Sequence, residues 1–158
     1  MPDVDPAAFR ELLGHFATGV TIVTAVGPDG RPVGMTASSL ASVSLDPPLV
    51  SLCVDQAADI HPILLEADRW TINILTDRQE ALSRRFAEPE HDRFDGVGYA
   101  TTADGLVLLE GALAHIECEP FAHHEAGDHT LFLGRVVGGA THAGKPLLYY
   151  RGGYGTPL

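Results

Sequence analysis

The sequence predicts a mainly β fold: an antiparallel barrel that closes on itself, with three helices packed against its outside. Segments with strand patterns outnumber helical segments, at about seven to three, and the two kinds do not alternate one for one. That order argues against a doubly wound parallel sheet. The 17 glycines and 11 prolines are spread along the chain, as turns between many short strands require. Closure of the sheet removes its exposed edges.

The first element is a helix that begins after Asp5. An Asp side chain caps the free amides of a helix, and Pro6 suits the first helical position. Apolar residues follow at the spacing i, i+3, i+4, i+7: Phe9, Leu12, Leu13 and Phe16. We expect this face of the helix to be buried, and Gly19 to end the segment.

Extended chain dominates the next forty residues. Val20 to Val26 is a strand rich in β-branched residues, and Gly27 to Gly30 is a turn by composition. Residues Arg31 to Ser44 form a second extended segment, which Asp46-Pro47-Pro48 breaks. Leu49 to Asp55 then forms an apolar strand.

The middle of the chain predicts two helices on either side of a strand. A short helix spans about Asp59 to Ala67, and Trp70 to Leu75 is a strand. The second helix runs from Thr76 to about Ala87, because Thr76 and Gln79 have the spacing of a capping box. Pro89 ends it.

Strand patterns return after the polar loop from Glu90 to Gly98. Residues 112–119 alternate between apolar and polar, which is typical of a half-buried antiparallel strand. Two further strands span His129 to Val137 and Leu147 to Arg151. No repeat, low-complexity tract or linker interrupts the sequence, so we expect residues 1–158 to form a single domain.

Charge and terminal composition narrow the expected partners and location. The formal net charge is −11. An acidic surface repels phosphate backbones and anionic headgroups, so we expect neither nucleic acid nor a membrane as a partner. The acidic N-terminus lacks the apolar core of a signal peptide, and no apolar run is long enough to span a bilayer. The expected location is the cytoplasm.

The cysteines and histidines predict neither a disulfide scaffold nor a metal site. Cys53 and Cys118 are far apart, form no CxxC pair and lie in apolar or alternating runs, which indicates buried structural thiols. Four histidines fall in one stretch: His115, His123, His124 and His129. No cysteine or carboxylate completes a recognisable ligand pattern with them.

The most unusual segment lies between Thr36 and Ser44, where five of nine side chains carry a hydroxyl group. Small residues let a flat ligand approach the backbone, and hydroxyls and amides can meet its polar edge. A Ser/Thr-rich edge strand with a turn has the same composition. Spacing does not decide between the two interpretations.

Six segments in order resemble the short-chain flavin reductases, the reductase components of two-component flavin-dependent monooxygenases. They are Phe16–Thr24, Gly34–Val50, Asn73–Leu75, Leu82–Ala87, Gly127–Gly134 and Pro146–Tyr154. The resemblance extends from about Phe9 to Tyr154. It implies an antiparallel split β-barrel of the FMN-binding type with peripheral helices, usually assembled as a homodimer.

The resemblance also implies a set of site residues. For the flavin these are Thr36, Ala37, Ser38 and Ser39 at the isoalloxazine edge, then Ser42, Cys53, Val54 and Asp55 facing the ring and ribityl chain, and Tyr154 in the last motif. Arg85, with Phe86 beside it, would hold the phosphate end, and Arg84 competes for that role.

Asp128 and His129 would form the nicotinamide site, with His129 as the catalytic residue. By position alone, His129 is a histidine at the start of a strand.

One segment, Gln56 to Asp59, departs from the family pattern. Many members carry hydroxyl residues where this chain has Ala57, Ala58 and the anionic Asp59. Because these residues offer no side-chain hydroxyl, the sequence does not predict how this segment would bind the flavin phosphate. It also leaves the choice between FMN and FAD open.

The implied activity is that of an NAD(P)H:flavin oxidoreductase that passes reduced FMN or FAD to a partner monooxygenase. Hydride transfer needs no general base, which agrees with the lack of an obvious acid–base pair. Two alternatives stay open: a flavin-binding electron carrier or storage protein, and an oxidase of a ligand such as pyridoxamine phosphate. The choice of NADH or NADPH, the identity of the monooxygenase, and whether the flavin stays bound or passes through are not fixed by the sequence.

Overall fold

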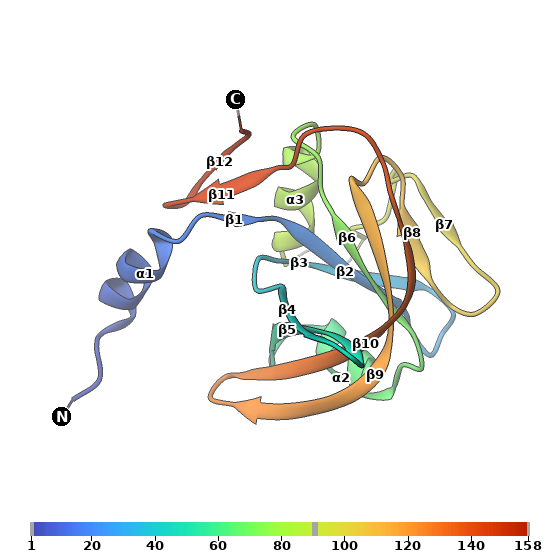
Figure 1. Ribbon diagram of the computed structural model, residues 1–158, viewed down its shortest axis with the longest axis horizontal. Helices are drawn as coiled ribbons and strands as arrows, with labels where there is room; N and C mark the ends of the chain where they lie inside the picture. Colours follow the sequence, from blue (N-terminus) through green and yellow to red (C-terminus); the bar gives the residue numbers. More distant parts are fainter. Residues whose placement is uncertain (1, 90–91, 158) are drawn as a thin grey trace.

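The computed structural model describes residues 2–89 and 92–157 and confirms a mainly β, antiparallel architecture with helices outside it (Figure 1). The main sheet has the strand order β3-β2-β6-β9-β10-β5-β4. Its strands are β2 (Thr21–Val26), β3 (Pro32–Ala37), β4 (Ala41–Leu45), β5 (Pro48–Asp55), β6 (Trp70–Ile74), β9 (Ala114–Ala126) and β10 (His129–Thr141). Every neighbouring pair is antiparallel.

The sheet is not closed, which confirms the split barrel that the resemblance implies and corrects the closed barrel expected from the strand pattern alone. In the described part of the chain, β3 and β4 are the two edges and do not pair with each other. They part at residues 38–40, which join them without strand structure. There the Ser39 hydroxyl accepts a hydrogen bond from the backbone N–H of Cys53 (3.0 Å) and lies 3.3 Å from its carbonyl. A side chain thus satisfies the edge of β5 where a neighbouring strand would otherwise do so.

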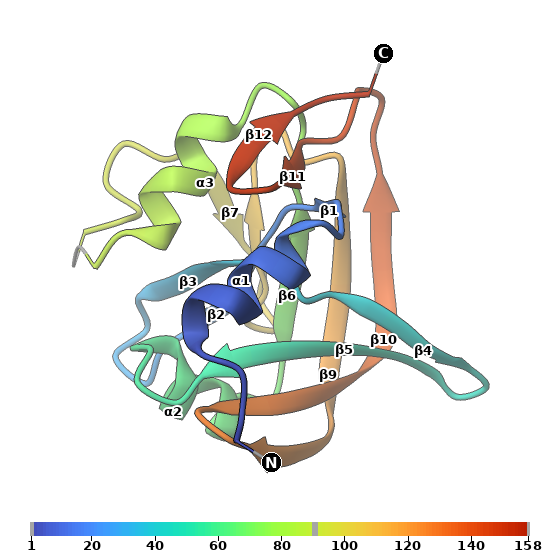
Figure 2. The ribbon, with the colours of Figure 1, turned by 90° about the vertical axis from the view of Figure 1, so that its left-hand side faces the viewer.

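Smaller elements complete the molecule. Strands β1 (Thr18–Gly19), β11 (Leu148–Tyr150) and β12 (Gly153–Gly155) form one small sheet, and β7 (Tyr99–Thr101) pairs with β8 (Val107–Leu109). The helices are α1 (Pro6–Gly14), α2 (Ile60–Glu66) and α3 (Glu80–Ala87). Helices α2 and α3 pack against β2 and β3, and the β4–β5 hairpin projects from the body (Figure 2).

Helix α3 begins at Glu80, later than the capping-box pattern predicts. The two residues of that pattern do interact: the Thr76 N–H donates to the Gln79 side chain, and the Gln79 N–H donates to the Thr76 carbonyl, both at 3.0 Å. These bonds close a turn that precedes the helix. The spacing therefore located a real contact but placed the helix about one turn too early.

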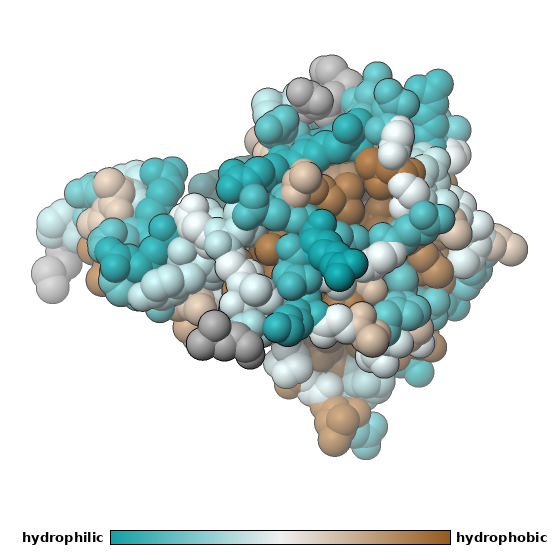
Figure 3. Space-filling model, turned by 90° about the horizontal axis from the view of Figure 1, so that it is seen from above, coloured by the Kyte–Doolittle hydropathy of each residue, from teal (hydrophilic) through white to brown (hydrophobic). Residues whose placement is uncertain are grey.

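Helix α1 is capped as expected, but its apolar face is exposed. The Asp5 carboxylate accepts from the Ala8 N–H at 2.8 Å. The expected buried face is open instead, with exposed fractions of 54% for Phe9, 63% for Leu12, 53% for Leu13 and 74% for Phe16. The helix stands apart from the barrel (Figure 1) and forms a separate lobe in Figure 3. The Arg151 N–H, donating to the Gly14 carbonyl at 2.9 Å, connects its end to the body.

The interior is divided into two apolar clusters. The larger lies between β2, β5, β6 and α2 and includes Val23, Leu52, Val54, Ile60, Trp70 and Phe132. The smaller lies beside α3 and includes Val20, Ile22, Leu75, Phe86 and Leu109. Asn73, fully buried, donates to the Ile22 carbonyl and accepts from the Leu109 N–H, so it connects β2, β6 and β8. A buried amide with satisfied partners fixes the relative position of these strands.

The two cysteines differ in environment. Cys118 is fully buried, and this burial raises the pKa of its thiol to about 12. Cys53 is only half-buried. The expectation of two buried structural thiols therefore holds for Cys118 and fails for Cys53. Both are free thiols.

Candidate functional site

A cleft of about 620 Å³ opens at the split between β3 and β5. Its walls come from α1 and β1, the end of β3 with residues 38–41, β5, and the first residue of β10. The lining residues are Leu13, Phe16, Thr18, Met35, Thr36, Ala37, Ser38, Ser39, Leu40, Ala41, Cys53, Asp55 and His129. Apolar side chains lie beside hydroxyls and one imidazole, a combination that suits a flat ligand with a polar rim.

Seven of the residues predicted from the resemblance line this cleft together: Thr36, Ala37, Ser38, Ser39, Cys53, Asp55 and His129. They come from three separate segments of the chain. The antiparallel register of β5 and β10 places His129 directly opposite Asp55. The turn out of β3 brings Ser39 to Cys53 through its two backbone contacts. The segments meet because of strand pairing rather than closeness in sequence.

Three other predicted residues do not line the cleft. Val54 is fully buried in the larger core cluster, on the face of β5 opposite Cys53 and Asp55. Phe86 is fully buried, with its ring 4.9 Å from that of Phe94. Ser42 lies on β4, paired with Val50, outside the cleft lining. Successive side chains of a strand face opposite ways, so the run 53–55 cannot present three side chains to one ligand.

Arg85 is engaged by the loop that follows α3. Its guanidinium donates to the carbonyls of Arg93 (2.7 Å), Asp92 (3.0 Å) and Asp95 (2.7 Å). The competing Arg84 pairs with Glu80 at 3.4 Å and does not line the cleft either. Arg85 thus organises the loop that follows α3, and it does not line the cleft.

Arg93 is the basic residue that sequence reasoning missed. It lines a second hollow of about 400 Å³, which shares Met35, Thr36 and Asp55 with the cleft. Its Nη1 donates to the Gly34 carbonyl at 2.8 Å, which holds the side chain against β3. Arg93 belongs to a polar loop, and nothing in the sequence of such a loop distinguishes an arginine that packs against a strand from one that is exposed to solvent.

Tyr154 supports the cleft from behind rather than lining it. Its hydroxyl lies 2.8 Å from the Oγ of Ser83, which is buried. The backbone carbonyl of Ser83 accepts from the Thr36 hydroxyl at 2.6 Å. The C-terminal hairpin is therefore connected through α3 to the strand that carries the hydroxyl-rich segment.

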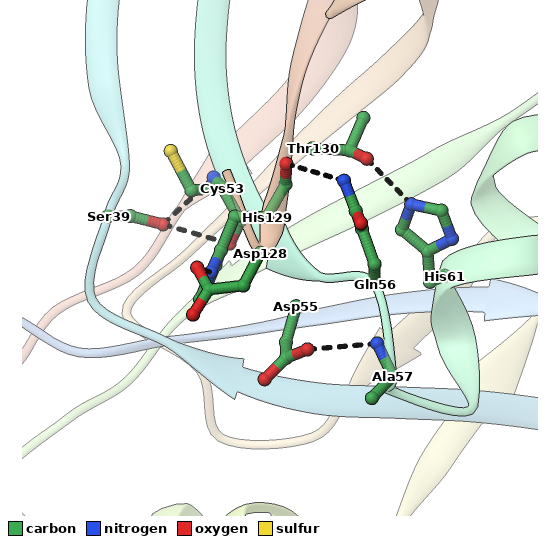
Figure 4. Close-up of polar contacts among 9 residues, drawn as sticks. All are labelled: Ser39, Cys53, Asp55, Gln56, Ala57, His61, Asp128, His129 and Thr130. Atoms are coloured by element: carbon green, nitrogen blue, oxygen red, sulfur yellow. Dashed lines mark hydrogen bonds and ion pairs between the residues drawn. The ribbon is translucent and has the colours of Figure 1, made fainter. Parts of the chain in front are cut away.

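His129 is oriented by its neighbour Asp128. The Asp128 carboxylate lies 2.7 Å from Nδ1 of the imidazole, and this hydrogen bond holds the pKa of Asp128 below its usual value. An ionised carboxylate only accepts, so Nδ1 carries the proton and Nε2 remains for a ligand. Behind His129, the His61 ring contacts the Thr130 hydroxyl at 2.7 Å and connects α2 to β10 (Figure 4).

Two kinds of feature are absent from residues 2–89 and 92–157. These residues hold no group of three or more side chains placed to bind a metal ion. Nor do they include a helix with the length and apolar character needed to cross a membrane.

Comparison with known proteins places this cleft in a family. A model described as flavin reductase like domain matches residues 13–157. Stc3, the stachydrine N-demethylase reductase subunit of Rhizobium meliloti, is 43% identical over 153 residues, covering 97% of this chain and 66% of Stc3. SmoA, an FMN reductase (NADH) of Agrobacterium fabrum, is 43% identical over 148 residues, covering 94% of this chain and 84% of SmoA.

The fold agrees with a solved relative. The NADH:FAD oxidoreductase SgcE6 of Streptomyces globisporus, solved with NAD and FAD fragments, superposes with a TM-score of 0.89 at 39% identity. The match covers 98% of this chain and 95% of SgcE6. Because the family model covers nearly the whole chain and these relatives share its fold, the chain belongs to the flavin reductase like domain family.

Proposed function

We propose that this chain is an NAD(P)H:flavin oxidoreductase that supplies reduced flavin to a partner monooxygenase. The observation that carries the proposal is the meeting of the hydroxyl-rich segment 36–39 with His129 in one open cleft. When bound, a flavin ring accepts a hydride from a reduced nicotinamide. The chain's contribution is to hold two flat rings in contact, which explains why the cleft needs no acid–base pair.

The cleft residues fit a flavin in a definite way. Met35, Ala37 and Leu40 offer apolar contact for the ring, and Ser38 is an exposed hydroxyl beside them. The Ser39 hydroxyl is already hydrogen-bonded to the backbone N–H of Cys53, so its role is to hold residues 38–40 against β5. One oxygen of Asp55 accepts from the Ala57 N–H at 2.8 Å, which leaves the other for ribityl hydroxyls.

The phosphate end of the flavin is assigned to the hollow that Arg93 lines. That hollow continues from the cleft past Thr36 and Asp55. In a chain with a net charge of −11, a phosphate needs a local cation, and Arg85 is already engaged by three carbonyls. One relative is named as an FMN reductase and another as an NADH:FAD oxidoreductase, so both flavins belong in the assay of this chain.

A steady-state assay with all four pairs of FMN or FAD with NADH or NADPH tests the proposed function. We expect nicotinamide absorbance to fall with at least one pair, in proportion to enzyme concentration. Absence of turnover with every pair would refute a reductase. A flavin-binding electron carrier would instead purify with tightly bound, coloured flavin and leave NADH unoxidised.

We also infer that a second copy of the chain covers the exposed face of α1. Three large apolar side chains of α1, together with Phe16 just after it, form an exposed patch that a soluble monomer rarely keeps. Leu13 and Phe16 also line the cleft. The homodimer that the family resemblance implies would bury this face. The reductase would work in the cytoplasm, where reduced nicotinamide is available.

Replacing Leu12 by glutamate is expected to convert the dimer into a monomer. The charge would have to be buried without a partner, which costs several kcal/mol at an interface. Light scattering coupled to size exclusion measures the mass directly. Leu65→Glu, the same change at a 40% exposed position on α2, is the control and should leave the dimer intact. A wild-type chain that elutes as a monomer at all concentrations would contradict the inference.

A further inference from the structure

Gln56 makes two contacts with the backbone where the turn at Asp128 enters β10 at His129. Its backbone N–H donates to the carbonyl of Asp128 at 3.0 Å. Its side-chain Nε2 donates to the carbonyl of His129, also at 3.0 Å (Figure 4). These are consecutive carbonyls, so one residue holds the backbone on both sides of His129 Cα. Gln56 is the first residue after β5 and belongs to the segment in which this sequence departs from its family's pattern.

The turn that Gln56 holds is otherwise exposed. Gly127 adopts a left-handed φ of +64°, and the Asp128 side chain is 92% exposed. The strand pairing of β10 ends at His129, which lies opposite Asp55 on β5 and Ala126 on β9, so Gly127 and Asp128 connect β9 to β10 beyond the ladder. The Asp128 carboxylate fixes the imidazole relative to the turn, but not the turn relative to the cleft. A contact from β5 to this backbone supplies that second constraint.

We propose that Gln56 is a positioning residue for His129: it fixes the backbone of the nicotinamide-binding histidine to the strand that lines the flavin cleft. The proposal rests on the proposed function. Binding groups lose effectiveness when displaced by about 0.5 Å, so loosening the turn weakens the contact of His129 with the nicotinamide. The flavin contacts of residues 36–39 lie on another segment and do not depend on this bond.

Two substitutions test the side-chain bond while leaving the backbone bond in place. Gln56→Ala removes the donor, and Gln56→Glu keeps the size of the side chain but can only accept at neutral pH. We expect each to raise the KM for NADH roughly fivefold, the scale of one amide–carbonyl bond, with kcat and the KM for flavin within about twofold. Gln79→Ala is the matched control, because Gln79 Nε2 donates to the Glu110 carbonyl at the same 3.0 Å outside the cleft.

A double-mutant cycle with His129→Ala separates positioning from a general structural effect. If Gln56 acts through His129, then Gln56→Ala has no further effect on the KM for NADH once the imidazole is gone. Effects that multiply independently would overturn the proposal, as would an unchanged KM in both single variants. A wild-type enzyme without NADH turnover would refute the proposed function instead, so the two failures are distinguishable.

Discussion

His129→Ala is expected to raise the KM for NADH by about 10- to 100-fold, the range for losing a hydrogen bond to a charged or strongly polar partner. The imidazole is half-exposed in the cleft, and its Nδ1 is already bonded to Asp128, so Nε2 is the atom available to the dinucleotide. Initial rates at saturating flavin, with NADH varied, measure the effect.

The same change should leave flavin binding almost intact. The hydroxyl-rich segment and Asp55 would still line the cleft after the imidazole is removed. His124→Ala, at an exposed histidine on β9 outside the cleft lining, is the control and should match the wild type. Equal KM values for NADH in the His129 variant and the wild type would remove His129 from the nicotinamide site.

Ser38→Phe is expected to weaken flavin binding by about 100-fold or more, which corresponds to roughly 2.7 kcal/mol. Ser38 lies exposed between β3 and β4, where the cleft is lined by small residues. A phenyl ring there occupies the space that the flavin needs. Titration of flavin fluorescence gives the Kd.

The fold should survive this change, because Ser38 stands outside the strand ladder and its side chain is not buried. Circular dichroism and the thermal midpoint check this directly. Thr101→Phe, on the exposed strand β7, places the same ring away from the cleft and should bind flavin normally. A folded Ser38 variant with wild-type affinity would show that the flavin lies elsewhere.

Helix α1 shows what a sequence pattern can predict and what it cannot. Its cap at Asp5 is local chemistry, and the prediction of the helix start was correct to the residue. Its apolar stripe, however, predicts only that something covers it, not that the same chain does. The apolar face of α1, which includes Leu12, is exposed because the barrel core is packed without any residue of this helix.

The basic residues show a different limit. Arg85 matched a family motif, yet its long side chain reaches three carbonyls of a loop that no sequence rule places beside it. Arg93 and Gln56 carry no motif at all, and their contacts are with backbone atoms distant in sequence. Val54 is the exception, since the period-2 alternation of β5 already indicates that it faces away from Cys53.

The sequence by itself determined the antiparallel strands, the three helices, the hydroxyl-rich segment and, through six ordered motifs, the flavin reductase family. The strands, the helices and the hydroxyl-rich segment are properties of local composition and periodicity, whereas the family follows from the resemblance of the six motifs. Only the tertiary structure decided which side chains share the cleft. It did so through the register that sets His129 opposite Asp55, the parting of β3 from β4 with Ser39 bonded to Cys53, and the Gln56 bonds. Such contacts depend on how strands pair across dozens of intervening residues, and pairing is settled by burial of the whole sheet rather than by any one segment.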